Sequence, residues 1–462
     1  MTEELWRLPA HRLAAMIARG ETTSRTVVEA HLARIEVVNK RSNAITRVLA
    51  DSALAAADAA DSRPASGPLH GVPFTIKENI DFVGTPTTQG VPAFANAMPT
   101  QDAPVVQRMK AAGAIPIGRT NLPELASRLS TDNPLYGRTL NPWNPSLTAG
   151  GSSGGDAVAL ATGMTPLGLG NDICGSLRNP AYCCGVVSLK PTAGRIAHAI
   201  SLPPSDGGMA SQLMYVQGPM ARTIEDLRIG LKVLAGRDIR DPVSVDASLT
   251  GPRPSSLRAA LITGVPGKPL PASVVAAVRA AGKVLGAAGW QVEEVEAPEL
   301  ALVNELWGRV LSLDFSPVMP PLKRVLSPAV FDLLNRLCGR FADLPPMENE
   351  VLHAERHRVA REWSQLFAAY PVMVGPVWAE LPWPADADLD PTSGLDLMLS
   401  TARFITPANV LGLPAIAMTT GLADGMPMGI QVYADLWRED LCLEAAAIIE
   451  AGSRQVTPTD PA

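Results

Sequence analysis

Residues 148–191 decide the fold, because they hold three motifs joined by short apolar runs. They read TAGGSSGGD at 148–156, NDICGSLRNP at 171–180 and CGVVSLKP at 184–191. Ser152 and Ser176 therefore lie in two glycine-flanked loops, and the upstream segment GVPFTIKEN places Lys77 after a third apolar run. Two hydroxyls and one amine can supply a nucleophile, a proton shuttle and a base without a histidine. The three motifs together predict acyl transfer, and amide hydrolysis in particular.

The composition indicates a globular protein with a large core. The chain has 462 residues, of which 47% are hydrophobic and 18% are charged. A net charge of −6 without a basic run argues against a nucleic-acid partner. No apolar run reaches the roughly 18 residues of a transmembrane helix, and the N-terminal MTEELW does not resemble a signal peptide. Five scattered cysteines indicate a reduced, cytoplasmic protein without a disulfide framework.

Strand-like and helix-like segments alternate from residue 71 onward. This pattern predicts an α/β fold in which helices sandwich a central mixed, twisted sheet. The expected strands are 73–76, 114–117, 166–169, 186–189, 259–262, 370–377, 414–420 and 428–433. The expected helices cover most of residues 1–60 and the segments 103–112, 156–162, 273–288 and 439–452. We expect a single domain, 1–462, with these parts: N-terminal helices at 1–65, a catalytic core at 66–235 and 405–455, and a mostly helical insertion with some strands at 236–404.

The first serine loop, GGSSGG at 150–155, has several interpretations. A glycine-serine run is usually a flexible linker, and the lysine that a phosphate-binding loop requires is absent. The loop also matches Gly-x-Ser-x-Gly, so a nucleophile elbow of the α/β-hydrolase type is an alternative. That elbow needs a strand directly before the serine, whereas residues 141–149 contain two prolines and no strand pattern.

The second loop is better suited to hold a nucleophile. It follows a predicted strand, and Gly175 directly before Ser176 lets the backbone approach a substrate closely. Successive N–H groups in such a turn can converge to form an oxyanion hole. The expected donors are the backbone N–H groups of Ile173, Cys174, Gly175 and Ser176. Ser176 is the predicted nucleophile.

Lys77 is the candidate base. A lysine accepts a proton only when it is neutral, so burial must lower its pKa by several units from about 10.4. The apolar run before Lys77 places it at a strand end with its stem in the interior. A surface lysine at a strand end is the alternative for this segment alone, and the two serine loops favour the base.

The residues quoted above resemble the amidase signature family, serine hydrolases with a Ser–Ser–Lys triad. The matching segments are 71–79, 119–123, 141–155, 166–178 and 184–194, with TPANVLGLPA from 406 and GMPMGIQ from 425. The resemblance implies that Ser176 forms the acyl-enzyme, Lys77 is the base, and Ser152 relays the proton after a cis Gly151–Ser152 bond. It also implies that Ser153 supports the loop by hydrogen bonding. Asp172 and Arg178 form a bracing ion pair by the same resemblance.

This chain departs from the family at the second loop. The family commonly has Thr-Asp-Thr-Gly-Gly-Ser where this chain has Asn171-Asp-Ile-Cys-Gly-Ser176. Cys174 thus places a side chain beside the expected oxyanion hole, where it narrows the acyl pocket. A thiol nucleophile at this position is a weaker alternative than a residue that contributes only its N–H group.

The family implies several substrates: acyl and aryl amides, esters, anilides, carbamates, or glutamine in a glutaminase component of a tRNA amidotransferase. Apolar residues of the insertion favour a hydrophobic or aromatic amide, although they equally suit ordinary packing. They are Trp307, Phe315, Met319, Leu322, Phe331, Leu334 and Met347.

His353 and His357 flank Glu355 without a third ligand, so we expect a solvated helix face, no metal and no cofactor. Family members are often homodimers, which makes a homodimer an expectation here.

Overall fold

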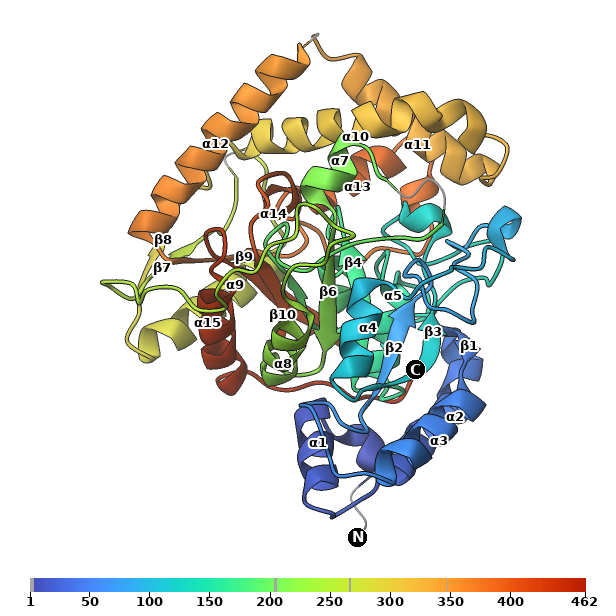
Figure 1. The fold of residues 1–462 in the computed structure, drawn as a ribbon. Coiled ribbons are helices and arrows are strands. Elements are labelled where there is room, and N and C mark those ends of the chain that lie inside the picture. Colours follow the sequence, from blue (N-terminus) through green and yellow to red (C-terminus); the bar gives the residue numbers. More distant parts are fainter. Residues whose placement is uncertain (1–3, 203–205, 266, 346) are drawn as a thin grey trace.

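A computed structural model describes residues 4–202, 206–265, 267–345 and 347–462. Its centre is one sheet of 11 strands in the order β1-β3-β2-β4-β6-β5-β10-β11-β9-β7-β8 (Figure 1). The strands are β1 (Ile45–Val48), β2 (Pro73–Lys77), β3 (Ile115–Thr120), β4 (Leu167–Asp172), β5 (Val187–Lys190), β6 (Val216–Ala221), β7 (Arg258–Leu261), β8 (Gln291–Glu294), β9 (Val372–Pro376), β10 (Ala415–Ala423) and β11 (Met426–Tyr433).

The sheet is mixed, as predicted. Strands β3, β2 and β4 run parallel, and so do β9, β7 and β8 at the other end. The strands between them pair antiparallel, including the β10–β11 hairpin. The segment 236–404 therefore contributes three strands to the same sheet as the serine loops.

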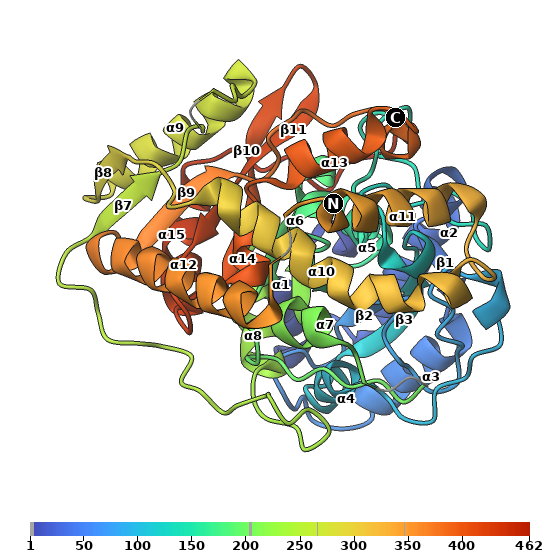
Figure 2. The same ribbon diagram turned by 90° about the horizontal axis from the view of Figure 1, so that it is seen from above.

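Helices cover the sheet and one end of it. The α-helices are α1 (Ala10–Ala18), α2 (Ser24–Ser42), α3 (Ala50–Asp61), α4 (Pro104–Ala111), α5 (Gly154–Ala161), α6 (Arg178–Cys184), α7 (Met209–Met214), α8 (Ile224–Leu234), α9 (Ala272–Ala287), α10 (Leu300–Leu322), α11 (Pro328–Ala342), α12 (Asn349–Ala369), α13 (Gly394–Ala402), α14 (Thr406–Val410) and α15 (Glu439–Ala451). Short 3₁₀ turns are Leu5–Arg7, Pro92–Phe94, Glu124–Ala126 and Ala387–Leu389. Helices α10, α11 and α12 lie across the top of the molecule, and Figure 2 looks down on them.

Three strands were not predicted, and each has a physical reason. Strand β1 is four residues long and ends in exposed side chains, so its pattern is weak. Strand β6 contains Gly218 and Pro219, which are rare in strand interiors and hide the signal. Strand β8 is a polar edge strand, Gln-Val-Glu-Glu, as expected where an edge must resist further pairing.

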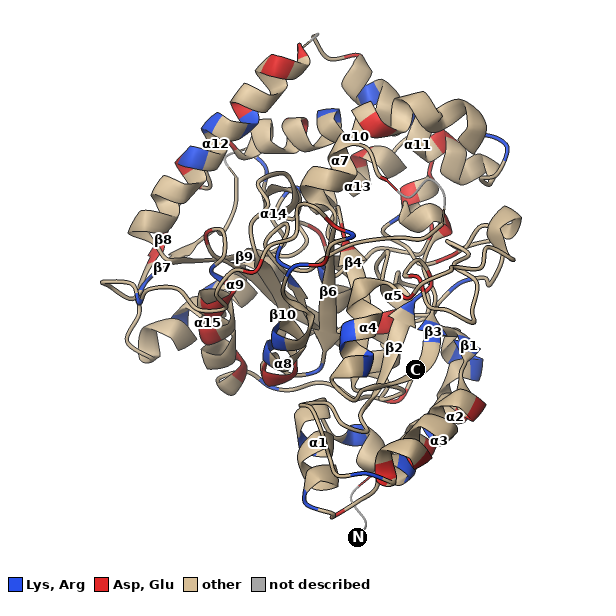
Figure 3. Ribbon diagram, viewed as in Figure 1, with Lys and Arg blue, Asp and Glu red and all other residues tan. Residues whose placement is uncertain are grey.

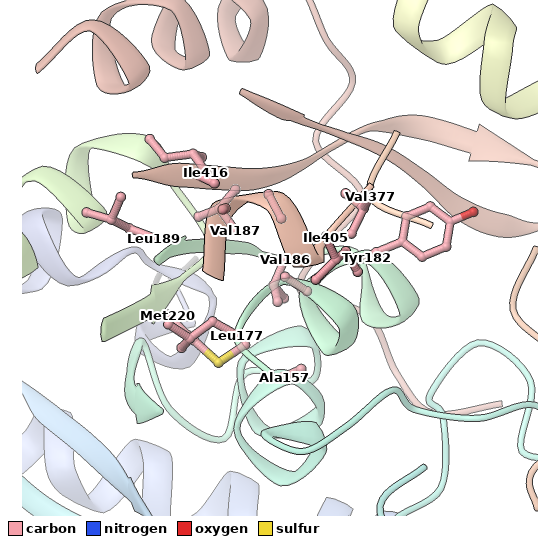
Figure 4. Packing of buried hydrophobic residues seen from close by; sticks show 14 of the residues in the cluster. Ala157, Leu177, Tyr182, Val186, Val187, Leu189, Met220, Val377, Ile405 and Ile416 are labelled. Carbon is pink, nitrogen blue, oxygen red and sulfur yellow. The ribbon is translucent and has the colours of Figure 1, made fainter. Parts of the chain in front are cut away.

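The core extends directly beneath the second serine loop. Leu177, which follows Ser176, is fully buried and packs against Gly170 of β4 and Gly218 of β6. Figure 4 shows Leu177 beside Met220, with Ile405 and Val186 nearby. Burying a leucine side chain stabilises the folded state by roughly 1.5–3 kcal/mol. The end of the loop is therefore held by packing as well as by hydrogen bonds.

Charged residues of both signs lie along the outer helices, for example on α12 (Figure 3). In the part of the chain that the structure describes, no helix combines the length and apolarity needed to cross a membrane.

Candidate active site

Lys77 is the last residue of β2, and the second serine loop begins where β4 ends. The two strands are parallel neighbours, with Ile76 opposite Leu169. Because their carboxyl ends meet at one edge of the sheet, Lys77 and Asn171 come together. Lys77 Nζ lies 2.7 Å from Asn171 Oδ1, and both residues are buried.

The first serine loop delivers Ser152 to the same point. Lys77 Nζ and Ser152 Oγ are 2.7 Å apart, and Ser152 is only 1% exposed. The Gly151–Ser152 peptide bond is cis, as the resemblance implied. Gly151 also touches a neighbouring segment, since a Cβ there would lie 2.4 Å from the carbonyl oxygen of Arg128. The loop position thus requires glycine before the serine.

Asp172 organises the turn that carries Ser176. Its Oδ1 accepts the N–H of Gly175 (2.7 Å) and its Oδ2 accepts the N–H of Leu177 (3.2 Å). Arg178 donates its Nε and Nη2 groups to the same carboxylate at 3.1 and 3.2 Å, and both side chains are fully buried. Burial raises the pKa of Asp172, but attraction to Arg178 and hydrogen bonds outweigh it, so the pKa is lowered overall. The predicted ion pair is present in the structure.

Asn179 joins the two serine loops, and the sequence analysis did not identify it. Its Nδ2 donates to the carbonyl oxygens of Gly151 (3.1 Å) and Cys174 (2.9 Å). Trp378 Nε1 donates to Asn179 Oδ1 at 2.8 Å and so fixes the amide orientation. The backbone adds another link, because Ser153 N–H donates to the Ser176 carbonyl oxygen at 3.1 Å. Ser152 and Ser176 are therefore held in one rigid unit.

Burial shapes the ionisation of the site. It lowers the pKa of Lys77, although the charges of Asp156 and Asp172 oppose this effect. It raises the pKa of Asp156, whose Oδ1 lies 3.3 Å from Thr75 Oγ1. A lysine whose pKa is lowered carries a larger neutral fraction near neutral pH, which is the form that can accept a proton.

The structure corrects two details of the predicted site. The Gly175 N–H donates to Asp172 Oδ1 at 2.7 Å, so of the four predicted oxyanion donors those of Ile173, Cys174 and Ser176 stay as the prediction. The Ser153 hydroxyl, expected to support the loop by hydrogen bonding, is buried with no hydrogen-bond partner among the described residues. Ser153 supports the loop through its backbone N–H instead. For Cys174, burial and the charge of Asp172 raise the pKa to about 12, which disfavours a thiolate nucleophile.

A cavity of about 900 Å³ is lined by described residues between Val265 and Thr406, none of them from the serine loops, and it meets the second loop through Trp307. Trp307 of α10 forms one wall, and its Nε1 donates to the carbonyl oxygen of Ile173 at 3.2 Å. Apolar walls include Leu300, Phe341, Leu399 and Ala402, and charged walls include Lys268, Glu305, Arg340 and Arg403. Of the apolar residues singled out in the insertion, Trp307 lines this cavity, whereas Met319 and Leu334 are buried in the core.

Two alternatives lose support. The residues directly before Ser152 do not form one of the strands of the sheet, so the geometry of a nucleophile elbow is absent there. His353 and His357 lie on α12, and the described residues contain no group of three or more His, Cys, Asp or Glu side chains that could hold a metal.

The fold and the site define a hydrolase of amide bonds. The family model described as Amidase matches residues 26–443, and the chain belongs to this amidase family. It is 40% identical to an indoleacetamide hydrolase of Bradyrhizobium diazoefficiens, over 96% of this chain and 86% of that protein. It is 34% identical to a component of the glutamyl-tRNA(Gln) amidotransferase of a Roseiflexus species, covering 92% of both chains. The solved structure of a 6-aminohexanoate cyclic dimer hydrolase has a TM-score of 0.84 at 27% identity, covering 99% of this chain and 100% of that one.

The predicted fold class and the predicted reaction are therefore confirmed. The protein is an enzyme, an amidase that cleaves carboxylic amide C–N bonds in a small-molecule substrate.

Proposed function

We propose that Ser176 is the nucleophile, Lys77 the general base and Ser152 the proton relay between them. The observation that carries this proposal is the 2.7 Å contact between Lys77 Nζ and Ser152 Oγ, made by two buried groups. A hydroxyl is a weak nucleophile until a base removes its proton. Asn179 supports the assignment, because it holds the loop of Ser152 against the loop of Ser176.

The reaction then has two stages. Ser176 Oγ attacks the carbonyl carbon of the amide, and its proton passes through Ser152 to the neutral amine of Lys77. The same relay returns a proton to the leaving amine, so the C–N bond breaks and an ester on Ser176 remains. Water next attacks this ester with help from the same base, which releases the acid and restores Ser176.

The developing negative charge requires donors in the second loop. We assign this role to the backbone N–H groups of Ile173, Cys174 and Ser176. One such donor typically lowers the activation barrier by about 3–4 kcal/mol. Asp172 and Arg178 act indirectly, since they hold the loop in the shape that aims these groups.

We further propose that the acyl group is small and aromatic, as in indoleacetamide. The cavity beside the loop offers Trp307 and Phe341 as apolar walls, and aromatic ligands favour such surfaces. The indoleacetamide hydrolase of Bradyrhizobium supports the same choice of substrate. Esters, anilides and carbamates with an aryl group are the next compounds to compare.

A glutaminase component of a tRNA amidotransferase is the second candidate, supported by the Roseiflexus relative. That relative shares 34% identity with this chain, against 40% for the indoleacetamide hydrolase. The candidates differ in a simple assay: a stand-alone amidase hydrolyses aryl amides as a purified chain, whereas a transferase component hydrolyses glutamine and requires partner chains.

The test compares a panel of aryl amides, anilides, esters, carbamates and glutamine. We expect Ser176→Ala to reduce turnover of the best substrate by roughly a thousandfold or more, with thermal unfolding unchanged. Lys77→Ala should remove the rise in rate that accompanies deprotonation of Lys77. Ser52→Ala, at an exposed position on α3, is the matched control and should behave as wild type. Full activity of Ser176→Ala would overturn the assignment.

We also propose a cytoplasmic enzyme that acts as a homodimer. Five free cysteines suit a reducing compartment, and the family resemblance implies the dimer. Sedimentation of the purified protein at micromolar concentration tests the oligomeric state, and a monomer would contradict it.

A further inference from the structure

Two buried asparagines beside Lys77 have no role in the reaction described so far. Asn171 is on β4, and Asn79 lies two residues after the end of β2. Asn171 Oδ1 lies 2.7 Å from Lys77 Nζ, while Asn171 Nδ2 donates to Asn79 Oδ1, also at 2.7 Å. Both asparagines are buried, at 1% and 6% exposure. A chain of contacts thus runs from Asn79 through Asn171 and Lys77 to Ser152.

The direction of the Asn171 amide matters for a neutral lysine. A neutral amine has two N–H groups and one lone pair, and the lone pair must face Ser152 to accept its proton. Asn171 Oδ1 can only accept a hydrogen bond, so it binds an N–H group of Lys77 and leaves the lone pair free. A flipped amide would present Nδ2–H to the lone pair and compete with Ser152.

Asn79 favours the first of these two orientations, and the Tyr215 hydroxyl is a further hydrogen-bond partner of Asn171. Asn79 Oδ1 is an acceptor and pairs with Asn171 Nδ2, which keeps Asn171 Oδ1 on the side of Lys77. Asn79 Nδ2 adds a long contact of 3.5 Å to Asn171 Oδ1. Flipping the Asn171 amide would place two oxygens against each other, which costs a buried hydrogen bond.

The pair orients Lys77 without adding charge. The charged groups that act on Lys77 are Asp156 of α5 and Asp172 of β4, and both favour the protonated amine. A further carboxylate at the Asn79 position would raise the pKa of Lys77 and reduce its neutral fraction. Two neutral amides avoid this effect and still satisfy the buried amine.

We propose that Asn171, oriented by Asn79, is a positioning residue that directs the lone pair of Lys77 toward Ser152. This inference rests on the proposed role of Lys77 as the base. It goes further, because it explains how a buried amine with two close neighbours keeps its lone pair available.

The experiment compares Asn79→Ala, Asn79→Asp and Asn171→Leu in the pH profile of kcat and in KM for an aryl amide. Asn79→Ala removes the acceptor at 2.7 Å from Asn171 Nδ2 and leaves the Tyr215 hydroxyl as the other polar contact of this amide, so kcat should fall at least tenfold across the profile with KM within twofold. Asn79→Asp keeps an acceptor for Asn171, so the maximal kcat should return close to wild type. The added charge should move the acid limb to higher pH by about half a unit or more. Asn171→Leu should lower kcat further than Asn79→Ala.

Asn144→Ala, in a polar turn whose side chain bonds only to Ser146 among the described residues, is the control and should match wild type. A wild-type pH profile and kcat in both Asn79 variants would overturn the inference while leaving Lys77 as the base. Activity in Lys77→Ala would instead overturn the proposed function. If Asn79→Ala fails to fold, kcat of the folded Asn171→Leu enzyme still decides, and a wild-type kcat there would overturn the inference.

Discussion

Replacing Asp172 with asparagine tests whether the brace of the second serine loop controls both stability and catalysis. The substitution keeps the shape of the side chain and removes its charge. Asp172 receives five hydrogen bonds: from the N–H groups of Gly175 and Leu177, from Nε and Nη2 of Arg178, and from Nδ2 of Asn409. The amide oxygen of an asparagine can replace one carboxylate oxygen of Asp172. The amide NH₂ group then occupies the place of the second carboxylate oxygen, where it faces N–H donors and cannot accept from them.

The magnitude follows from the contacts that are lost. If the new amide keeps the Oδ1 partners, the bonds from Leu177 and Arg178 Nε at Oδ2 are broken. Hydrogen bonds to a charged group are each worth about 1.5–3 kcal/mol. Removing one partner of a buried ion pair costs about 3–5 kcal/mol. The first route gives a loss of about 3–6 kcal/mol in the free energy of unfolding and the second about 3–5 kcal/mol, a large part of the usual roughly 5–15 kcal/mol.

The assay measures the denaturation midpoint together with kcat for an aryl amide. We expect a lower midpoint and a kcat reduced at least tenfold, because the turn that carries the N–H donors loosens. Asp226→Asn is the matched control: Asp226 is a buried carboxylate that accepts the N–H groups of Ala10 and His11 at the start of α1. It should lower stability while leaving kcat of the folded enzyme unchanged. A stability loss below about 1 kcal/mol with full kcat in Asp172→Asn would refute the reasoning.

Three further predictions concern other parts of the molecule. Gly175→Ala should lower kcat at least tenfold, because φ is +79° and a Cβ would lie 2.4 Å from Ile405 Cγ2; wild-type kcat would contradict this. Burial lowers the pKa of Lys190 to about 7, so unfolded chains bind an extra proton above that pH and stability rises between pH 7 and 9. Lys190→Met should reduce this rise by up to about 1.4 kcal/mol per pH unit in denaturant titrations, and an unchanged slope would refute it. Arg128→Met leaves buried Asp388 without its bidentate partner, so unfolding should become easier by about 3–5 kcal/mol; an unchanged midpoint would count against it.

The proposed catalytic residues could be named from sequence because each lies in a short motif near a strand end or in a glycine-rich loop. Lys77 ends a buried strand, and Ser176 lies four residues beyond the end of the parallel strand beside it, so local patterns place both at the same edge of the sheet. Asn179 could not be predicted in the same way. Its function depends on Trp378, which is 199 residues away in the chain and reaches it only through the completed sheet.

Sequence motifs also do not show which backbone N–H groups already have hydrogen-bond partners. The sequence indicates that four N–H groups surround the turn at residues 173–176, but it does not show which of them are already used. The structure assigns the Gly175 N–H to Asp172. A carboxylate that braces a turn does so by occupying N–H donors, so Asp172 removes Gly175 from the donors of the proposed oxyanion hole.

The cavity shows a different limit of sequence reasoning. Apolar residues at helical spacing in the insertion could line a pocket or fill a core, and both outcomes occur: Trp307 lines the cavity, whereas Met319 and Leu334 are buried in the packing. The packing of α10 determines which of its residues line the cavity and which are buried. Helix α10 packs on α11, α14 and α7, and in this position Trp307 lies against Ile173. The reacting groups are fixed by short loops and the walls by long-range packing. Under the proposed function, a change in α10 would alter the amide that fits the cavity and leave Lys77, Ser152 and Ser176 in place.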